Sequence, residues 1–196
     1  MAQLKSSLKN MLISLTVIPL IAAAALGGVY QMTKEPIELA QKEKQNSAIK
    51  EVLKDKTAKI GKEVEITLDG KPFPYIIFPA QKDGKLVGAA IQTYTMDGYA
   101  GRIDVMVGVD AEGTISNYTI LSSGETPGLG SKLADWFKTE RNNQSINGKN
   151  PEKNKFSVKK DGGDFDAITA STISSRAFLG SIQSAFDAFK KYKEQK

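Results

Sequence analysis

The longest uncharged apolar stretch of the chain runs from Met11 to Tyr30. Twenty residues of α-helix rise about 30 Å, which matches the hydrocarbon core of a bilayer. Pro19 lies inside the stretch, and a membrane helix tolerates a proline where neighbouring groups satisfy the freed carbonyl. We therefore predict one transmembrane helix over residues 11–30, preceded by a tail over residues 1–10.

A cleaved signal peptide is the alternative for this segment, because Ala22 to Ala25 resemble a small-residue cleavage site. The apolar run is longer than the roughly 7–15 residues of a signal peptide's apolar region, which favours a retained anchor. Lys5 and Lys9 precede the run without an acidic residue. The positive-inside rule then places the N-terminus in the cytoplasm and the main domain on the periplasmic side of the inner membrane.

Residues 31–60 have the pattern of a helical linker. Thr33 and Pro36 resemble a helix start. Apolar residues then recur at helical spacing to about Lys54, at Ile37, Ala40, Ala48, Val52 and Leu53.

From Lys62 onward the pattern changes to the alternation that is typical of β-strands. The predicted strands are Glu63–Leu68, Tyr75–Phe78, Leu86–Thr95, Arg102–Val109 and Thr114–Ser122, with a further one at Phe156–Lys160. Asp83-Gly84 and Glu112-Gly113 lie in the connections, and the second pair predicts a hairpin.

Two helices are expected after the main strands. A short one over Ser131–Glu140, capped by Ser131, would bury Leu133, Trp136 and Phe137, with Trp136 in the core and not against a cofactor. Arg141–Asn154 is polar and rich in asparagine, which predicts an exposed loop. The last helix carries apolar side chains three to five residues apart, at Ile173, Ala177, Phe178, Ile182, Ala185, Phe186 and Phe189. This order predicts an α+β domain over residues 61–196, with a mostly antiparallel sheet and flanking helices.

Composition narrows the possible chemistry. The chain has no cysteine and no histidine, which excludes disulfides, iron–sulfur ligation, histidine metal sites and a Ser-His-Asp triad. Lys5 and Lys9 account for two of the 27 basic residues, so residues 31–196 carry 25 basic against 22 acidic side chains. That balance gives no reason to expect nucleic-acid binding. An electron carrier in this chain would have to be an organic cofactor.

Residues 166–176 concentrate four hydroxyl side chains directly before the last apolar-periodic segment, at Thr169, Ser171, Thr172 and Ser174. Serine and threonine at this place are typical helix N-caps. A helix N-terminus also has free N–H groups and partial positive charge, so it can hold a phosphate group. Both interpretations fit the pattern.

This stretch resembles the flavinylation motif of the FMN-binding domain family, found in the G subunit of the Rnf electron-transfer complex and the C subunit of the sodium-translocating NADH:quinone reductase. In that family, a threonine hydroxyl is esterified to the FMN phosphate within Ser/Thr-Gly-Ala-Thr, an apolar residue and Ser/Thr. The resemblance places the acceptor at Thr172. Ala170 stands where glycine is usual and Ser171 where alanine is usual, so Thr169 and Ser171 are competing hydroxyls.

Two further stretches, residues 98–110 and 124–130, are similar to the rest of the same domain. In that family the Glu-Thr-Pro-Gly-Leu-Gly loop lies beside the isoalloxazine ring. The resemblance covers Leu86 to Phe189, and the length of 196 residues suits the Rnf G subunit better than the longer C subunit. The cofactor-binding residues expected besides the four at 169–172 are Glu125, Thr126, Gly128, Leu129 and Lys132.

The resemblance implies a membrane-anchored electron-transfer flavoprotein with covalent FMN. Its partners would be the other membrane subunits of an Rnf-type complex, which couples ferredoxin and NAD oxidoreduction to ion translocation, and a flavin transferase that uses FAD. It would need no catalytic acid, base or metal of its own, because the flavin supplies the chemistry.

Two other functions stay open. One is a component like the C subunit of the quinone reductase. The other is a non-redox, anchored binding or scaffold module, which the departures at Ala170 and Ser171 keep possible. Asp161 to Asp166 lack the ligand spacing of an EF-hand, so a turn is expected there and not a calcium site.

Overall fold

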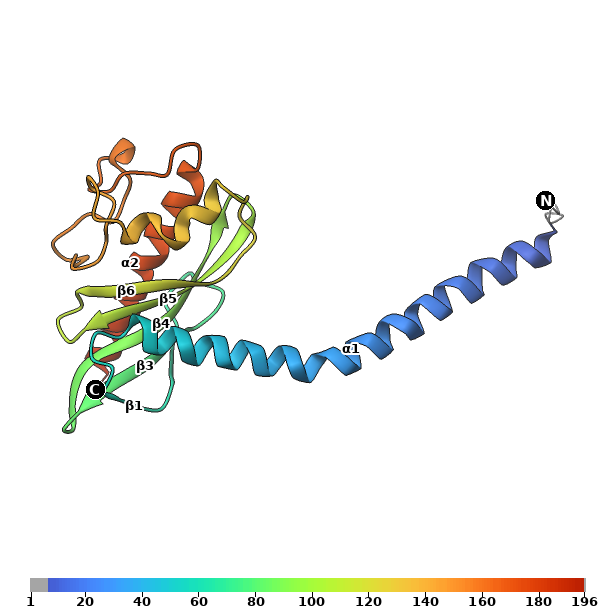
Figure 1. The fold of residues 1–196 in the computed structure, drawn as a ribbon, viewed down its shortest axis with the longest axis horizontal. Coiled ribbons are helices and arrows are strands. Elements are labelled where there is room, and N and C mark those ends of the chain that lie inside the picture. The colour runs from blue at the N-terminus through green and yellow to red at the C-terminus, as the bar shows by residue number, and fades with distance from the viewer. Residues whose placement is uncertain (1–6, 196) are drawn as a thin grey trace. The chain divides into compact units, whose positions relative to one another are not determined.

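The computed structural model describes residues 7–195 and divides the chain into two units, residues 1–44 and 45–196 (Figure 1). Lys5, one of the two cations behind the predicted topology, lies outside the described residues. So does most of the predicted tail.

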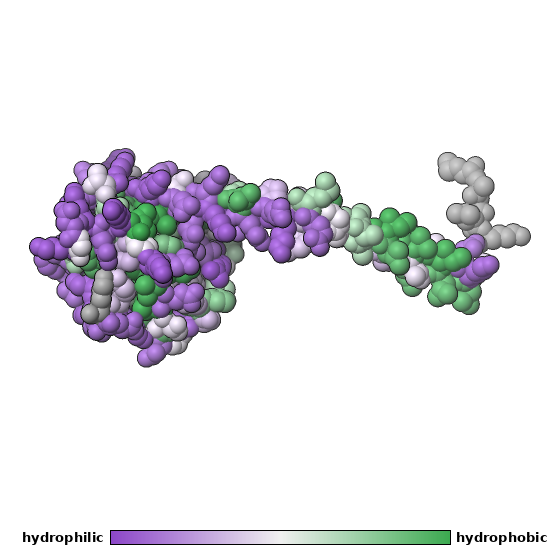
Figure 2. Space-filling model, turned by 90° about the horizontal axis from the view of Figure 1, so that it is seen from below, coloured by the Kyte–Doolittle hydropathy of each residue, from purple (hydrophilic) through white to green (hydrophobic). Residues whose placement is uncertain are grey.

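The N-terminal unit is helical. Helix α1 spans Leu8–Val52 without interruption, so one element covers both the predicted membrane span and the predicted linker helix. It is the one helix among the described residues that is long and apolar enough to cross a membrane, with a mean hydropathy of 2.2 over its most apolar window. Figure 2 shows apolar surface along its N-terminal part and polar surface further on.

The predicted helix start at Thr33 is wrong. The Thr33 hydroxyl donates a hydrogen bond backwards to the carbonyl of Val29 (2.9 Å), where a capping residue would accept one from the turn that follows. Pro36 lies inside the helix, and the carbonyl that it leaves unpaired belongs to an exposed helix.

The second unit is built on a six-stranded antiparallel sheet. The order is β1-β3-β4-β5-β6, and β2 also pairs with β3. The strands are β1 Lys59–Ile60, β2 Val64–Ile66, β3 Tyr75–Lys82, β4 Lys85–Gly98, β5 Gly101–Asp110 and β6 Ile115–Ser123. The predicted α+β class and the hairpin at Glu112-Gly113 are therefore confirmed, while the two-residue β1 was missed.

Strand β3 continues four residues past its predicted end because Pro79 does not interrupt the ladder. The Pro79 carbonyl accepts a hydrogen bond from Gly61 N–H (2.8 Å), on the side away from its β4 partner Ala89. A residue in an antiparallel strand directs its nitrogen and its carbonyl to the same side. The nitrogen of Pro79 therefore also points away from β4, so the lack of an N–H removes no hydrogen bond between β3 and β4.

Both faces of the sheet are covered. Helix α2, Thr172–Glu194, packs across one face, as Figure 1 shows, and forms the larger core cluster with alternate strand residues such as Ile91, Val105 and Val107. Residues 48–52 of α1 cover the other face, against Ala90 and Met106. This double coverage explains why β5 is buried almost continuously and does not alternate with solvent.

Four predictions between β6 and α2 need correction. The helix expected over 131–140 is two 3-10 turns, η1 Gly130–Ala134 and η2 Trp136–Lys138, separated at Asp135. Ser131 does not cap it, because its hydroxyl accepts a bond from the Gly128 N–H (2.9 Å). The loop 141–154 is not fully exposed, since Ile146 is completely buried.

The predicted strand over 156–160 is also wrong. Phe156 and Val158 are buried, as the alternation suggested, but among the described residues Val158 forms only an isolated bridge with Phe165. The backbone then turns into the 3-10 helix η3, Lys159–Asp161. Trp136 is half-buried against the core, and its indole N–H donates to the carbonyl of Asp166 (2.8 Å), in agreement with a core role.

Candidate functional site

The hydroxyl-rich motif forms the first turn of α2. Thr172 is the first helical residue and is half-buried, while Ser171 occupies the N-cap position and is only 8% exposed. Thr169 and Ala170 precede the helix and are exposed. Of the hydroxyls near the acceptor position, the Thr172 hydroxyl is thus the one that is both accessible and placed on the helix end.

The N-cap chemistry expected from sequence is not what the structure contains. Within residues 7–195, no side chain caps α2 at Ser171. The hydroxyl of Ser175 fixes the turn from inside the helix: it accepts a bond from the Ile168 N–H (3.0 Å) and donates one to the Ser171 carbonyl (2.9 Å). This leaves the end of a 23-residue helix with its partial positive charge available to an anion.

The backbone turns sharply just before the helix. Ala170 has a φ of +62°, in the left-handed region that glycine adopts without steric cost. The site therefore needs the conformation that a glycine in the family's pattern would supply, and here an alanine adopts it.

The loop after β6 lies against this helix end through Glu125. This carboxylate is 7% exposed, and both of its oxygens are engaged. Oε2 accepts a bond from the Ser174 hydroxyl (2.6 Å), and Oε1 accepts one from the Ala100 N–H (3.1 Å) in the β4–β5 turn. Three segments distant in sequence meet at this side chain, so the structure brings Glu125 together with the motif.

The other predicted loop residues lie at the surface. Thr126, Gly128 and Lys132 are exposed, and the Thr126 carbonyl accepts bonds from the N–H groups of Leu129 (3.1 Å) and Ser131 (3.3 Å), which makes the loop compact. Leu129 is 40% exposed. Apolar side chains are also exposed on the two segments that Glu125 contacts. Tyr99 in the β4–β5 turn is 71% exposed, and Ile173 in the first turn of α2 is 49% exposed. Such a surface suits a flat aromatic ligand better than open polar surface would.

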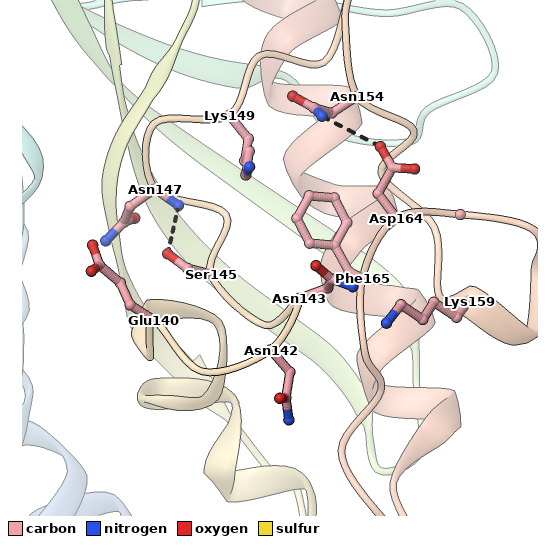
Figure 3. A pocket seen from close by; sticks show the side chains of 11 residues that line it. Glu140, Asn142, Asn143, Ser145, Asn147, Lys149, Asn154, Lys159, Asp164 and Phe165 are labelled. Carbon is pink, nitrogen blue, oxygen red and sulfur yellow. Dashed lines mark hydrogen bonds between the residues drawn. The ribbon is translucent and has the colours of Figure 1, made fainter.

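Two cavities of the described chain can be compared as places for a ligand. One of about 270 Å³ is bordered by Ile173, Arg176 and Thr95, directly beside the first turn of α2. Another of about 560 Å³ is polar, and Figure 3 shows the asparagines and lysines around it. Its described lining includes none of the predicted site residues, and its Lys159 is already paired with Asp166 (2.9 Å). We therefore place the candidate site at the helix end.

Sequence reasoning missed two parts of this site. Ser174 was visible as a member of the hydroxyl run, but nothing in the sequence marked it as the partner of Glu125. The Ala100 N–H carries no side-chain signal at all, because any residue other than proline supplies the same donor.

Comparison with known proteins finds a family model that matches part of this chain. The family model of the FMN-binding domain matches residues 98–187, a range that contains Glu125, the loop and the motif.

Several curated relatives share one name, that of the G subunit of an ion-translocating oxidoreductase complex. The protein from Salmonella typhi is 42% identical over 113 residues, which is 56% of this chain and 53% of the relative. The one from Erwinia tasmaniensis is 38% identical over 118 residues, 58% of this chain and 55% of the relative. These two alignments span about half the length of each relative. The protein from Aliivibrio fischeri is 29% identical over 201 residues, 97% of this chain and 94% of the relative. The resemblance drawn from the motifs is thereby confirmed.

Proposed function

We propose that this chain is the membrane-anchored FMN-carrying subunit of an Rnf-type ion-translocating oxidoreductase, with FMN joined to Thr172 through a phosphoester. The observation that carries the proposal is the place of Thr172: this residue is half-buried on the first turn of α2, beside the Glu125 loop, and within the described residues no side chain caps that turn at Ser171. The match to the FMN-binding domain and the relatives' shared name support it.

The residues present fit a flavin phosphate. The N-terminus of α2 favours one negative charge by roughly 0.3–1 kcal/mol at an exposed site, which orients a phosphate but does not hold a dissociable cofactor tightly. A covalent bond removes the need for affinity. Bound flavin would supply the redox chemistry. The chain's own part is to fix the phosphate end at Thr172 and to hold the loop 125–130 beside the ring.

Attachment needs a transferase and FAD. The Thr172 oxygen bonds to the phosphorus of the FMN half of FAD while the pyrophosphate bond breaks, AMP leaves, and the hydroxyl proton passes to solvent. No electron is exchanged in this step. Thr169 and Ser171 are the rival acceptors, but Ser171 is nearly buried and Thr169 lies outside the helix, ahead of the left-handed turn. We likewise propose, as part of the same function, that the chain assembles with other membrane subunits and is modified by a flavin transferase.

Mass spectrometry tests the attachment directly. Trypsin should cut after Lys160 and after Arg176, which releases one peptide with all candidate hydroxyls. After co-production with a flavin transferase, that peptide should be heavier by FMN less one water, with fragment ions placing the addition on Thr172.

Thr172→Ala is the matched variant. It should be colourless yet folded, since within the described chain the Thr172 hydroxyl makes no hydrogen bond that the fold would lose. An addition on Thr169 or Ser171, or an unmodified peptide beside an active transferase, would refute the assignment. An unmodified peptide would favour the non-redox module.

A further inference from the structure

We propose that Glu125 and Ser174 form a clamp that sets the position of the attached flavin ring, with Ser174 as a positioning residue. The proposal rests on the proposed function for its cofactor. It differs from the expectation that Glu125 acts by touching the ring.

The carboxylate has little capacity left for a ligand. Ser174 is 1% exposed and its hydroxyl donates to Oε2 at 2.6 Å, within the range of strong charge-assisted bonds. The Ala100 N–H donates to Oε1, and the Glu125 side chain is almost fully enclosed. Glu125 therefore acts through what it holds in place.

The neighbouring backbone packs closely around the Glu125 carboxylate and leaves it no room to move. A Cβ on Gly130 would collide with Glu125 Oε2 and would lie 2.9 Å from the Ser174 hydroxyl. A Cβ on Gly98 would lie 2.8 Å from Glu125 Oε1. Glycine at both positions lets the loop and the β4–β5 turn close on the same side chain. The carboxylate is thus a fixed junction and not a mobile surface group.

The junction connects the two ends of the proposed cofactor site. Ser174 is two residues from Thr172, where the phosphate would be attached, and Glu125 begins the loop that reaches Leu129. Breaking the Ser174–Glu125 bond frees the loop from the helix end without removing the acceptor hydroxyl. The attached ring should then move more freely while attachment persists.

The first arm of the test uses flavin-free, full-length protein in detergent, produced without transferase. Ser174→Ala and Glu125→Gln should each make the Ala100 amide exchange hydrogen about tenfold faster, since a hydrogen bond to a charged group contributes about a factor of ten or more. Ser181→Ala is the matched control: it removes another buried serine hydroxyl of α2, one that donates to the Phe178 carbonyl (2.7 Å) and has no described bond to Glu125.

The second arm uses the same variants after co-production with the transferase. Both clamp variants should carry FMN, but its fluorescence anisotropy should fall and its midpoint potential should shift, neither of which Ser181→Ala should change. The double variant should show less than the sum of the two single effects, because both changes weaken the same Ser174–Glu125 bond.

Three outcomes would overturn the clamp. Anisotropy and potential in Ser174→Ala could match the Ser181→Ala control, the effects of the two single changes could simply add, or Ser174→Ala alone could abolish attachment while Glu125→Gln does not. If the parent carries no flavin, the proposed function fails instead, and the exchange arm still decides whether the clamp exists.

Discussion

Ala170 is the residue at which local backbone geometry most clearly opposes the side chain. Its φ of +62° costs an L-residue roughly 1–2 kcal/mol compared with glycine in the folded state, while glycine loses roughly 0.5–1 kcal/mol more chain entropy on folding. Ala170→Gly should therefore raise the free energy of unfolding by about 0.5–1 kcal/mol. Equilibrium denaturant unfolding measures this change.

Ala167→Gly is the control for Ala170→Gly. Ala167 lies three residues earlier and is not among the described residues with positive φ, so the same substitution should lower the free energy of unfolding. Equal effects of the two changes would mean that the left-handed turn carries no strain.

At the scale of the elements, the sequence predicted most strands and the final helix, because their periodicity reflects which face is buried. The predicted face of α2 is buried from Ala177 to Phe189, and only Ile173 is exposed. Ile173 lies outside the core and borders the 270 Å³ cavity beside the candidate site. A helix pattern cannot distinguish these two reasons for an apolar side chain.

The errors arose where one residue's local preference is overruled by a neighbour in space. The predicted strand Tyr75–Phe78 stopped before Pro79, but the nitrogen of Pro79 faces away from β4 and the strand continues. Phe156 and Val158 alternate as a strand would, yet the chain supplies only a single bridge beside them. The candidate site shows the same limit: the hydroxyl run was visible in sequence, whereas the Glu125–Ser174 contact depends on the fold.

The segment that leads into the motif is held by Asp166, which gives a test at low pH. Its carboxylate bonds to Lys159 (2.9 Å) and accepts the Asn143 N–H (3.2 Å), and these contacts lower the pKa of Asp166 below its usual value. A lowered pKa stabilises the fold above pH about 4, and this stabilisation is lost as pH falls through the folded-state pKa.

Asp166→Asn should therefore lower the free energy of unfolding at pH 7, by no more than about 1 kcal/mol because the pair is partly exposed. The gap to the parent should close below pH about 4. Urea unfolding at a series of pH values measures it, with Asp69→Asn in an exposed turn as the control for a lost charge. A gap that stays constant into strong acid would refute the pKa effect.

At the scale of the whole molecule, the predicted topology can be tested with a single cysteine, because the chain has none of its own. Lys153 is exposed in the loop before α2, so Lys153→Cys should react with an impermeant thiol reagent in intact spheroplasts. Ser7→Cys, on the other side of the apolar part of α1, should react only after the membrane is broken. The reverse pattern would invert the orientation.

Helix α2 follows all six strands in the chain and supplies the cover for the larger core cluster. During translation the sheet therefore emerges with that face uncovered, and it stays so until the ribosome has delivered residues 172–194. During the same interval the Glu125 carboxylate lacks the hydrogen bond that Ser174 donates in the folded protein. In the proposed function, the acceptor Thr172 therefore leaves the ribosome only after every strand of the sheet has been made.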